Sequence, residues 1–489
     1  MKIQLRSWAI GMLGAATLFC GVVAQAGAVR TVHAFAGYPG DGAAPHGTVA
    51  ISGSTLYGMT REGGPGSNGV IYKVNSDGTG YALLHTFPAF PGDGARPAGS
   101  LTLSGSLLFG TTYEGGAAGK GTIFKMRTDG GGLTVLRSFS GAPSDGEGPQ
   151  GSLTLSGSSL YGMTWFGGAY NGGAVFKSGT NGTGFTLLHS FTNHPTDGLY
   201  PEGSLAISGS TLFGMTDWGG AGGQGTVFKL NTSGGGFGLL HSFAGGTTDG
   251  AWPRGSLTLS GSTLYGMTYN GGSANQGTAF KMNTNGSSFN VLHSFTGAAT
   301  DGGYPAGSLT LSGPTLYGVT SVGGTGYVGT VFSLQTDGTG FGVLHSFTTA
   351  DGSGPLGSLA SSGTAMFGTT ELGGSSDAGL VFALPLGLWA GATDVGGGWS
   401  YLPWFGYFQD VGGGWIWHGQ LGWMFPNGSS TASIWLWYQH ASLWLWTSDS
   451  AYPFLWSSSH NAWLWYYEGT GNGNGGWFYN YGTGQVQWL

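Results

Sequence analysis

Seven variable dipeptides, most of them charged or aromatic, recur along the chain at steps of about 52 residues. Each follows a short apolar segment that ends in Thr: Arg61-Glu62, Tyr113-Glu114, Trp165-Phe166, Asp217-Trp218, Tyr269-Asn270, Ser321-Val322 and Glu371-Leu372. A second variable set lies beside recurring prolines: His46, Arg96, Gln150, Tyr200, Glu202, Trp252, Arg254 and Tyr304. Aromatic rings stack on the apolar faces of sugars while carboxylates and amides bind the hydroxyls, so this composition suits glycan recognition.

The same residues leave a catalytic alternative open. A pair of carboxylates can hydrolyse a glycosidic bond when the two groups flank it. The candidate acids are Glu62, Glu114, Glu202, Asp217 and Glu371, but nothing in the sequence fixes any two at the required separation. No serine nucleophile elbow or phosphate loop is present, and the Gly-rich strings read as turns. The sequence predicts no cofactor and favours a protein that is not an enzyme.

The segments that carry these dipeptides repeat with the same period. Asp-Gly pairs begin at Asp41, Asp93, Asp145, Asp197, Asp249, Asp301 and Asp351, and an aromatic residue before Gly recurs at Tyr57, Phe109, Tyr161, Phe213, Tyr265, Tyr317 and Phe367. Such strict spacing indicates one supersecondary unit copied seven times. Each copy contains four short segments rich in β-branched or aromatic residues and bounded by Gly, Asn or Asp, which is typical of strands.

Four strands in about 52 residues, seven times over, predict an all-β fold with a seven-bladed β-propeller over residues 31–384. We label the strands a (GSLTLSG), b (TLYGMT), c (GTVFK) and d (LLHSF). The segment Thr31–Phe35 matches strand d, and the seventh copy has no strand d of its own after Leu384. The N-terminal strand is therefore expected to complete the last blade and close the ring. An open β-solenoid or two separate sheets remain the alternatives.

A propeller would bring the variable residues together. Its b–c and d–a connections emerge on one face, which is where both variable sets fall. The predicted binding residues are Arg61, Glu62, Tyr113, Glu114, Trp165, Phe166, Tyr200, Asp217, Trp218, Trp252, Arg254, Tyr269, Tyr304 and Glu371. Loops held by a rigid scaffold commonly carry binding sites. The alternative interpretation is that the aromatic residues only fill gaps between neighbouring blades.

Recurring histidines raise the question of a metal. Strand d carries His33, His85, His189, His241, His293 and His345, with Arg137 at the third position. One histidine per blade would place these side chains far apart around the ring, whereas metal ligands must converge on one ion. We therefore predict a structural polar contact in each blade, to a loop backbone or to the nearby Asp, and no metal site.

The units GSLTLSGSTLYGMT, GTVFKLNT and FGLLHSF, with a Gly-Gly loop between the first two, resemble GloVer tandem repeats. These repeats occur in exported bacterial proteins whose C-terminal attachment modules vary. The resemblance covers about residues 31–384, with spacing and motif agreeing in all seven copies. It implies export and surface attachment, and it provides no catalytic residues to carry over.

The N-terminal residues 1–26 are predicted to be a signal peptide. Lys2 and Arg6 precede an apolar stretch, and Ala24-Gln25-Ala26 fits a cleavage site; an uncleaved membrane anchor is the alternative. Cys20 is the only cysteine, so cleavage would leave no disulfide or thiolate chemistry. We expect a secreted, extracellular or cell-surface protein of a bacterial envelope, monomeric and without a transmembrane segment once processed. A net charge of -7 argues against nucleic-acid binding.

The composition changes near Pro385. Residues 385–398 read as a Gly-rich linker, and residues 399–489 as a small Trp-rich β domain that serves as an anchor or binding module. Alternation in its Trp-Leu-Trp runs puts the rings on one face and Leu on the other. The predicted aromatic face comprises Trp435, Trp437, Trp444, Trp446, Trp463 and Trp465. That face would meet a partner, a polysaccharide or a membrane interface, unless it forms the core of the domain.

The leading hypothesis is an exported, non-catalytic, surface-associated protein that recognises a polysaccharide or a surface protein on the b–c/d–a face and attaches through its C-terminal domain. A polysaccharide-degrading propeller enzyme and a structural protein–protein scaffold are the two alternatives. The enzyme hypothesis requires two convergent carboxylates on that face, with a raised pKa on one of them.

Overall fold

A computed structural model describes residues 29–88, 92–192, 194–363 and 365–386. Beyond these it describes residues 393–396, 399–402, 405–412, 415–430, 433–439, 441–447, 452, 454–457, 459–467 and 476–489. The predicted signal peptide, residues 1–26, lies outside the described residues. Within the described ranges, no helix has the length and apolar character needed to cross a membrane.

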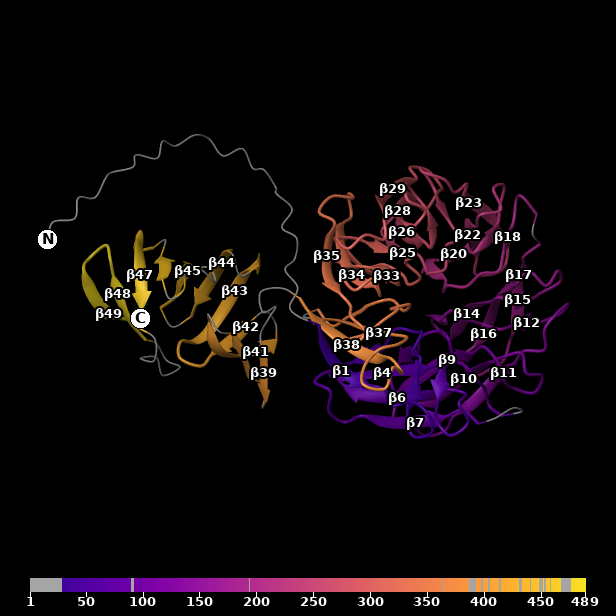
Figure 1. The fold of residues 1–489 in the computed structure, drawn as a ribbon, viewed down its shortest axis with the longest axis horizontal. Coiled ribbons are helices and arrows are strands. Elements are labelled where there is room, and N and C mark those ends of the chain that lie inside the picture. The colour runs from indigo at the N-terminus through magenta and orange to yellow at the C-terminus, as the bar shows by residue number, and fades with distance from the viewer. Residues whose placement is uncertain are drawn as a thin grey trace.

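Seven four-stranded antiparallel sheets, blades I to VII, form a ring, so the predicted propeller is confirmed (Figure 1). Strands a, b, c and d of blade I are β3 (Ala50–Ser52), β4 (Thr55–Thr60), β6 (Val70–Asn75) and β7 (Ala82–Thr86). Blade II contains β8 (Thr102–Ser104), β9 (Leu107–Thr112), β10 (Thr122–Arg127) and β11 (Thr134–Ser138). Blade III contains β13 (Thr154–Ser156), β14 (Ser159–Thr164), β16 (Ala174–Gly179) and β17 (Thr186–Ser190).

The remaining blades repeat this order. Blade IV contains β19 (Ala206–Ser208), β20 (Thr211–Thr216), β22 (Thr226–Asn231) and β23 (Gly238–Ser242). Blade V contains β25 (Thr258–Ser260), β26 (Thr263–Thr268), β28 (Thr278–Asn283) and β29 (Asn290–Ser294). Blade VI contains β31 (Thr310–Ser312), β32 (Thr315–Thr320), β34 (Thr330–Gln335) and β35 (Gly342–Ser346), and blade VII contains β36 (Ala360–Ser361), β37 (Ala365–Thr370) and β38 (Leu380–Pro385).

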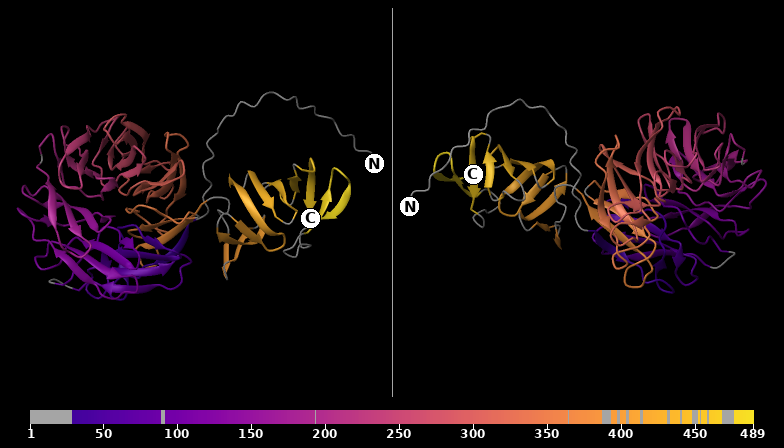
Figure 2. Two further views of the ribbon diagram at one scale, coloured as in Figure 1. Left: turned by 180° about the vertical axis from the view of Figure 1, so that it is seen from behind. Right: turned by 45° about the horizontal axis from the view of Figure 1, so that its top comes forward.

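The N-terminal strand closes the ring. Strand β1 (Arg30–Ala34) pairs antiparallel with β38, with Arg30 opposite Ala383 and Ala34 opposite Leu380. It therefore supplies the missing strand d of blade VII, as the sequence predicts. Figure 2 shows the ring from two further directions, with its indigo and orange ends adjoining.

The aromatic-glycine marker of each repeat has a packing cause. In blade IV, a Cβ atom built on Gly214 of strand b would lie 2.5 Å from Cζ of Phe228 on strand c. The corresponding glycines of the other blades meet the ring of Tyr72, Phe124, Phe176, Phe280, Phe332 or Phe382 in the same way. A ring of strand c thus occupies the space that a side chain on strand b would need, which fixes Gly at this position of every copy.

Seven further glycines surround the propeller axis, one at the start of each strand a region. This axial glycine ring consists of Gly47, Gly99, Gly151, Gly203, Gly255, Gly307 and Gly357. A Cβ atom built on Gly203 would lie 2.2 Å from the carbonyl oxygen of Gly255, and one on Gly151 would lie 2.1 Å from the oxygen of Gly203. Neighbouring blades therefore approach backbone to backbone, a separation that only Gly permits.

The histidines of strand d contact the aspartates of the Asp-Gly pairs, as predicted. In blade III, His189 Nε2 lies 3.0 Å from Asp197 Oδ1, and both Asp197 oxygens accept backbone N–H groups, from Gly198 and Thr192. Burial acts to raise the pKa of Asp197, but these hydrogen bonds outweigh it and hold the pKa below its usual range. The same pairing occurs at His33, His85, His241, His293 and His345, and Arg137 pairs with Asp145.

The C-terminal segment forms one antiparallel sheet in which each strand pairs with the next. Its strands are β39 (Thr393–Gly396), β40 (Trp399–Leu402), β41 (Gly406–Gly412), β42 (Trp415–His418), β43 (Gly422–Ser430), β44 (Ser433–Tyr438), β45 (Leu443–Thr447), β46 (Phe454–Ser457), β47 (Ala462–Tyr466), β48 (Trp477–Asn480) and β49 (Gln485–Trp488). Strand β39 falls within the segment expected to be a linker, so the sheet includes residues before Trp399.

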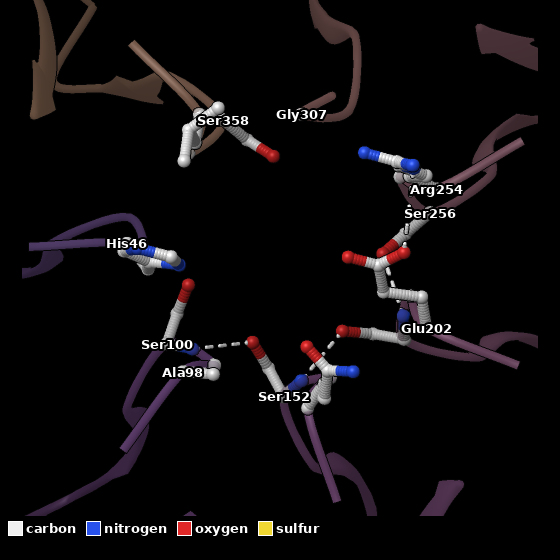
Figure 3. A pocket seen from close by; sticks show the side chains of 18 of the residues that line it. His46, Ala98, Ser100, Ser152, Glu202, Arg254, Ser256, Gly307 and Ser358 are labelled. Atoms are coloured by element: carbon white, nitrogen blue, oxygen red, sulfur yellow. Dashed lines mark hydrogen bonds and ion pairs between the residues drawn. The ribbon is translucent and has the colours of Figure 1, made fainter. Parts of the chain in front are cut away.

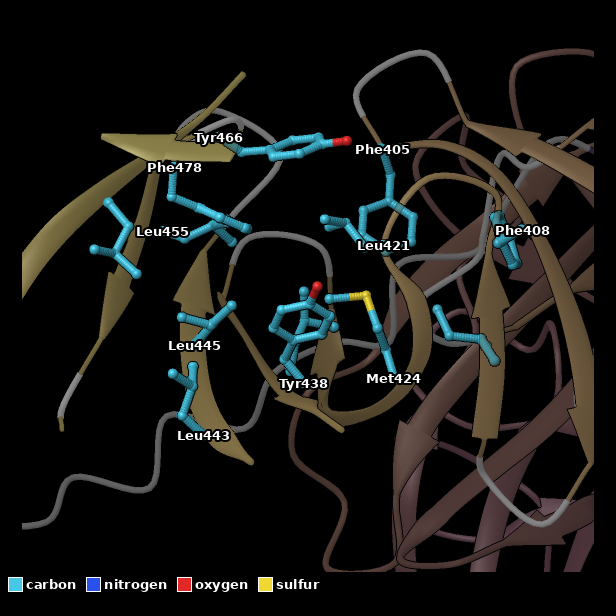
Figure 4. Packing of buried hydrophobic residues seen from close by; sticks show 13 residues of the cluster. Phe405, Phe408, Leu421, Met424, Tyr438, Leu443, Leu445, Leu455, Tyr466 and Phe478 are labelled. Atoms are coloured by element: carbon cyan, nitrogen blue, oxygen red, sulfur yellow. The ribbon is translucent and has the colours of Figure 1, made fainter. Parts of the chain in front are cut away.

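The two faces of this sheet differ as the alternation predicts. Leu436, Leu445 and Leu464 are buried in a core with Phe, Tyr and Met side chains (Figure 4). Trp437, Trp444 and Trp446 are half-buried, and Trp463 and Trp465 are 38% and 37% exposed. The side chain of Trp435 lies outside the described residues. Among those described, no tryptophan belongs to the core, so the aromatic face is the outer one.

The close approach of the blades at the axis predicts that even a methyl side chain on an axial glycine lowers the stability of the propeller strongly. We expect Gly203→Ala to destabilise the propeller by about 4 kcal/mol or more, because the methyl group would force blades IV and V apart. Gly238→Ala is the control, since a Cβ atom there meets nothing within 4 Å. Thermal unfolding followed by circular dichroism measures both variants, and equal midpoints for the two would contradict the axial constraint.

Candidate functional site

Short ladders hold the loops of the predicted binding face. In five places a two-residue strand of a d–a loop pairs with one of the following b–c loop: β2 (Gly42–Ala43) with β5 (Glu62–Gly63), β12 (Gly146–Glu147) with β15 (Phe166–Gly167), β18 (Gly198–Leu199) with β21 (Trp218–Gly219), β24 (Gly250–Ala251) with β27 (Asn270–Gly271), and β30 (Gly302–Gly303) with β33 (Val322–Gly323). Single bridges join Ala95 to Glu114 and Ser353 to Leu372 at the other two. Each variable dipeptide thus has a defined position.

One residue of each d–a loop adopts a left-handed conformation between two blades. These residues are Ala44, Arg96, Gly148, Tyr200, Trp252, Tyr304 and Gly354. Trp252, with a φ of 56°, donates its N–H to the carbonyl of Gln224 and accepts the N–H of Tyr269. Non-glycine residues in this region are strained by about 1–3 kcal/mol, and they persist only where surrounding contacts hold them. The loops are therefore rigid before any ligand arrives.

A cavity of about 450 Å³, the axial cavity, opens over the axial glycine ring. Its wall includes the residue before each axial glycine, together with three side chains of the b–c loops: His46, Ala98, Gln150, Glu202, Arg254, Ala306, Leu356, Arg61, Tyr113 and Trp165. Figure 3 shows Glu202 and Arg254 on one side of this space and His46 on another. The apolar residues Ala98, Ala306 and Leu356 complete the ring.

Two carboxylates come together beside the axial cavity. Arg254 Nε lies 3.8 Å from Glu202 Oε2 and 3.9 Å from Asp217 Oδ1. Burial raises the pKa of Glu202 to about 7, with a further contribution from the Asp217 carboxylate, while Arg254 and Arg61 oppose the shift. Burial likewise raises the pKa of Asp217 to about 6, against the charge of Arg254. The enzyme hypothesis required such a convergent pair, and the structure contains it.

The two acids differ in their access to the cavity. The side chain of Glu202 is 25% exposed and lines the cavity. The side chain of Asp217 is 5% exposed and does not belong to the cavity wall. Asp217 is therefore a buried partner of Arg254, and only Glu202 can touch a ligand in the axial cavity.

Six of the eleven buried side-chain N and O atoms that lack a hydrogen-bond partner in the described part of the chain belong to the loops around this pair. They are Gln150 Nε2, Glu202 Oε2, Asp217 Oδ1, Trp252 Nε1, Arg254 Nε and Asn270 Oδ1. All six belong to the face loops of blades III, IV and V. A buried polar group that lacks a partner costs roughly 1–3 kcal/mol, so a concentration of them in one sector points to hydrogen bonds made elsewhere, as with a ligand.

On the opposite side the charges are paired. His46 Nε2 lies 3.1 Å from Glu371 Oε1, and this contact is the main cause that holds the pKa of Glu371 below its usual range. Arg96 pairs with Glu114 at 3.5 Å on the exposed rim. Both of these contacts are shorter than the 3.8 Å that separates Glu202 from Arg254.

The aromatic residues of the face form stacked pairs. Trp218 lies on Trp252 with ring centroids 5.5 Å apart, and Tyr269 lies on Tyr304 at 4.9 Å. Trp165 lies over Phe166 at 6.0 Å, and the Arg254 guanidinium covers the ring of Tyr269 at 3.9 Å. Several of these aromatic side chains therefore pack between neighbouring blades, as the alternative interpretation expects. Trp165 and Tyr113 are the two aromatic side chains that line the axial cavity.

The predicted residues divide into three groups. Arg61, Tyr113, Trp165 and Arg254 line the axial cavity, whereas Asp217 lies behind it. The others occupy the surrounding loops without lining the cavity: Glu62, Glu114, Phe166, Tyr200, Trp218, Trp252, Tyr269, Tyr304 and Glu371. The sequence interpretation missed the hydroxyl residues that follow the axial glycines, Thr48 in the first copy and Ser in the other six, which also line the cavity. They recur in every copy, and a recurrent residue reads as scaffold.

The repeat pattern has a counterpart among known families. A family model described as Gloeobacter/Verrucomicrobia repeat matches residues 11–217, 143–329 and 200–387, which together span most of the chain. The chain belongs to the Gloeobacter/Verrucomicrobia repeat family. The resemblance inferred from the seven copies is thereby confirmed, and membership of this repeat family assigns no reaction to the axial cavity.

Solved structures with some likeness are of varied kinds. A streptogramin B lyase is 13% identical over 74% of this chain and 98% of its own, with a TM-score of 0.47. An oligogalacturonate lyase in complex with manganese is 12% identical over 73% and 93%, with a TM-score of 0.44, and TolB from Acinetobacter baumannii is 15% identical over 55% and 58%, with a TM-score of 0.35. At these TM-scores the likenesses carry no argument about function. No curated protein matches the chain.

In the described part of the chain, no group of three or more His, Cys, Asp or Glu side chains is placed to hold a metal ion. The histidines instead make separate contacts to the aspartates of their own blades. The side chains that line the axial cavity offer hydrogen bonding, stacking and charge.

The raised pKa of Glu202 predicts that the effect of replacing this residue on stability depends on pH. The folded protein holds the Glu202 proton up to about pH 7, whereas the unfolded chain loses it near 4.5. Stability is therefore lost as pH rises through this interval, and Glu202→Gln removes that loss. We expect Glu202→Gln to be more stable than the wild type at pH 8, by at most about 3 kcal/mol, and to be no more stable at pH 4.

Urea unfolding at the two pH values measures this difference. Glu114→Gln, which changes an exposed acid of the same face, is the control for the removal of one negative charge. A gain of stability by Glu202→Gln that is equal at pH 4 and pH 8 would show that Glu202 has an ordinary pKa.

Proposed function

We propose that this protein is an exported, surface-associated binding protein that performs no catalysis, and that the propeller recognises a glycan in the axial cavity. The observation that carries the proposal is the sector of unpaired polar atoms in blades III to V. Of these residues, Gln150, Glu202 and Arg254 line the axial cavity. Sugar hydroxyls both donate and accept hydrogen bonds, so they would satisfy amide, carboxyl and guanidinium groups together.

The aromatic residues of the cavity complete this recognition. Trp165 and Tyr113 present ring surfaces from the b–c loops of blades III and II. A cavity of about 450 Å³ falls within the range of about 300–1,000 Å³ that is typical of small-ligand sites. The rigid left-handed loop residues favour binding further, because little conformational entropy is lost when the ligand arrives.

Glycoside hydrolysis is less well supported, although a carboxylate pair exists. The reaction needs two carboxyl groups on opposite sides of the scissile bond. Glu202 and Asp217 lie on the same side, at one Arg254 nitrogen, and Asp217 does not reach the axial cavity. The raised pKa of Glu202 suits a hydrogen-bond donor below pH 7 as well as it suits an acid catalyst.

We assign attachment to the outer face of the C-terminal sheet. Trp463 and Trp465 of β47 remain exposed there, in register with aromatic residues of β46 and β48. Export rests on residues 1–26 and on the family resemblance. An exposed aromatic surface without Lys or Arg, which are absent after Lys281, suits a neutral polysaccharide better than an anionic membrane.

Removal of one aromatic side chain from the axial cavity tests whether the propeller binds the glycan. On a glycan array, the full chain is expected to bind at least one glycan, and Trp165→Ala should weaken that binding about tenfold or more because a stacking surface is lost. Tyr170→Ala is the matched control, since Tyr170 belongs to the same b–c loop and is 67% exposed. An array without any binding would favour a scaffold for protein partners.

A second pair of substitutions tests the C-terminal face. The double variant Trp463→Ala, Trp465→Ala should lose retention on insoluble cell-wall polysaccharide while keeping the wild-type far-ultraviolet circular dichroism spectrum, because the buried Leu464 and Tyr466 are unchanged. The control is Tyr170→Ala, Tyr327→Ala, which removes exposed rings from the propeller. Equal retention of both double variants would contradict attachment through this face.

A further inference from the structure

A ring of hydroxyl groups lies at the floor of the axial cavity. The hydroxyl oxygens of Ser100, Ser152, Ser204, Ser256, Ser308 and Ser358 each accept a backbone N–H from the preceding blade at 2.7–2.8 Å. All six serines line the cavity, and Figure 3 shows Ser100, Ser152, Ser256 and Ser358 around the open space. Contacts between neighbouring blades thus hold the hydroxyls around the axis.

The protons of these hydroxyls remain available. Each oxygen uses a lone pair on the neighbouring blade, and none of the six donates its proton to another atom in the described part of the chain. A serine hydroxyl has one proton to give. Six donors that converge on one axis create a positive potential there, as backbone N–H groups do in an anion-binding nest.

Basic side chains surround the same cavity. His46, Arg61 and Arg254 are the basic residues of its wall. His46 is paired with Glu371, and Arg254 lies beside Glu202 and Asp217.

Arg61 forms no ion pair within the described residues, yet its charge acts to lower the pKa of both Glu202 and Glu371. Arg61 is therefore within electrostatic reach of both acids, and among the described residues its guanidinium is the cation of the cavity wall that has no acidic partner.

We propose that the axial cavity binds the carboxylate of an acidic sugar residue, with the serine hydroxyls donating hydrogen bonds and Arg61 supplying the opposing charge. This inference rests on the proposed glycan-binding function and names the class of sugar. Two acids lie near this space, and each has a base beside it: Glu202 of the wall lies next to Arg254, and Glu371, outside the wall, pairs with His46. Charge-assisted hydrogen bonds of this kind are roughly twice as strong as neutral ones.

A matched pair of oligosaccharides tests the proposal. The probes are a cello-oligosaccharide and the same oligosaccharide whose primary alcohols have been oxidised to carboxylates, titrated by calorimetry into the full chain. We expect the oxidised probe to bind at least tenfold more tightly than the neutral one. Arg61→Gln should remove this preference, whereas Arg96→Gln, at an exposed rim position outside the cavity wall, should retain it.

The outcomes distinguish the carboxylate proposal from the wider proposal of glycan binding. Equal affinity for the two probes would overturn the carboxylate proposal and leave glycan binding standing. A preference that survives in Arg61→Gln would also overturn it, by moving the anion away from this site. Binding of neither probe counts against the acidic sugar, and the array result then decides the wider function. Ser152→Ala, checked for folding by circular dichroism, should weaken the oxidised probe selectively.

Discussion

The close approach of seven glycines around one axis is the constraint on which the propeller depends. Because a Cβ atom on Gly203 would meet the carbonyl of Gly255 at 2.2 Å, neighbouring blades touch backbone to backbone at the centre. The serines that follow six of these glycines each accept an N–H from the preceding blade, and β1 joins β38 to close the ring. On the outer strands, the His–Asp contacts hold the d–a loops. The repeat is thus a scaffold whose recurrent residues carry inter-blade contacts.

The residues that line the axial cavity vary at loop positions whose backbone this scaffold fixes. The residue before each axial glycine differs from blade to blade, so the wall changes from Ala98 and Leu356 to Glu202 and Arg254 around one cavity. Burial raises the pKa of Glu202 and leaves polar atoms of blades III to V unpaired. An ordinary repeat would have lost such costly groups, which is why their gathering in one sector favours binding over packing.

The fold could be predicted from the sequence because the period, the four strand-like segments and the unmatched strand at Thr31 all describe one closed ring. The same order of strands predicted on which face of the propeller the variable residues lie. The distance of each residue from the axis could not be predicted, because it depends on loop ladders and left-handed positions that recur in the copies but are occupied by different residue types, from Ala44 to Trp252. Glu202 and Asp217 lie in different loops, so their pairing through Arg254 is visible only in three dimensions. The axial serines escaped notice because they recur.

The proposed function depends above all on a glycan that binds in the axial cavity. A crystal structure of the full chain grown with a glycan that it binds on the array tests this directly. We predict a sugar residue over the serine ring, hydrogen-bonded to Glu202 and Gln150 and stacked on Trp165. A bound glycan located only on the C-terminal sheet, with the axial cavity filled by water, would contradict the claim and make the propeller a scaffold.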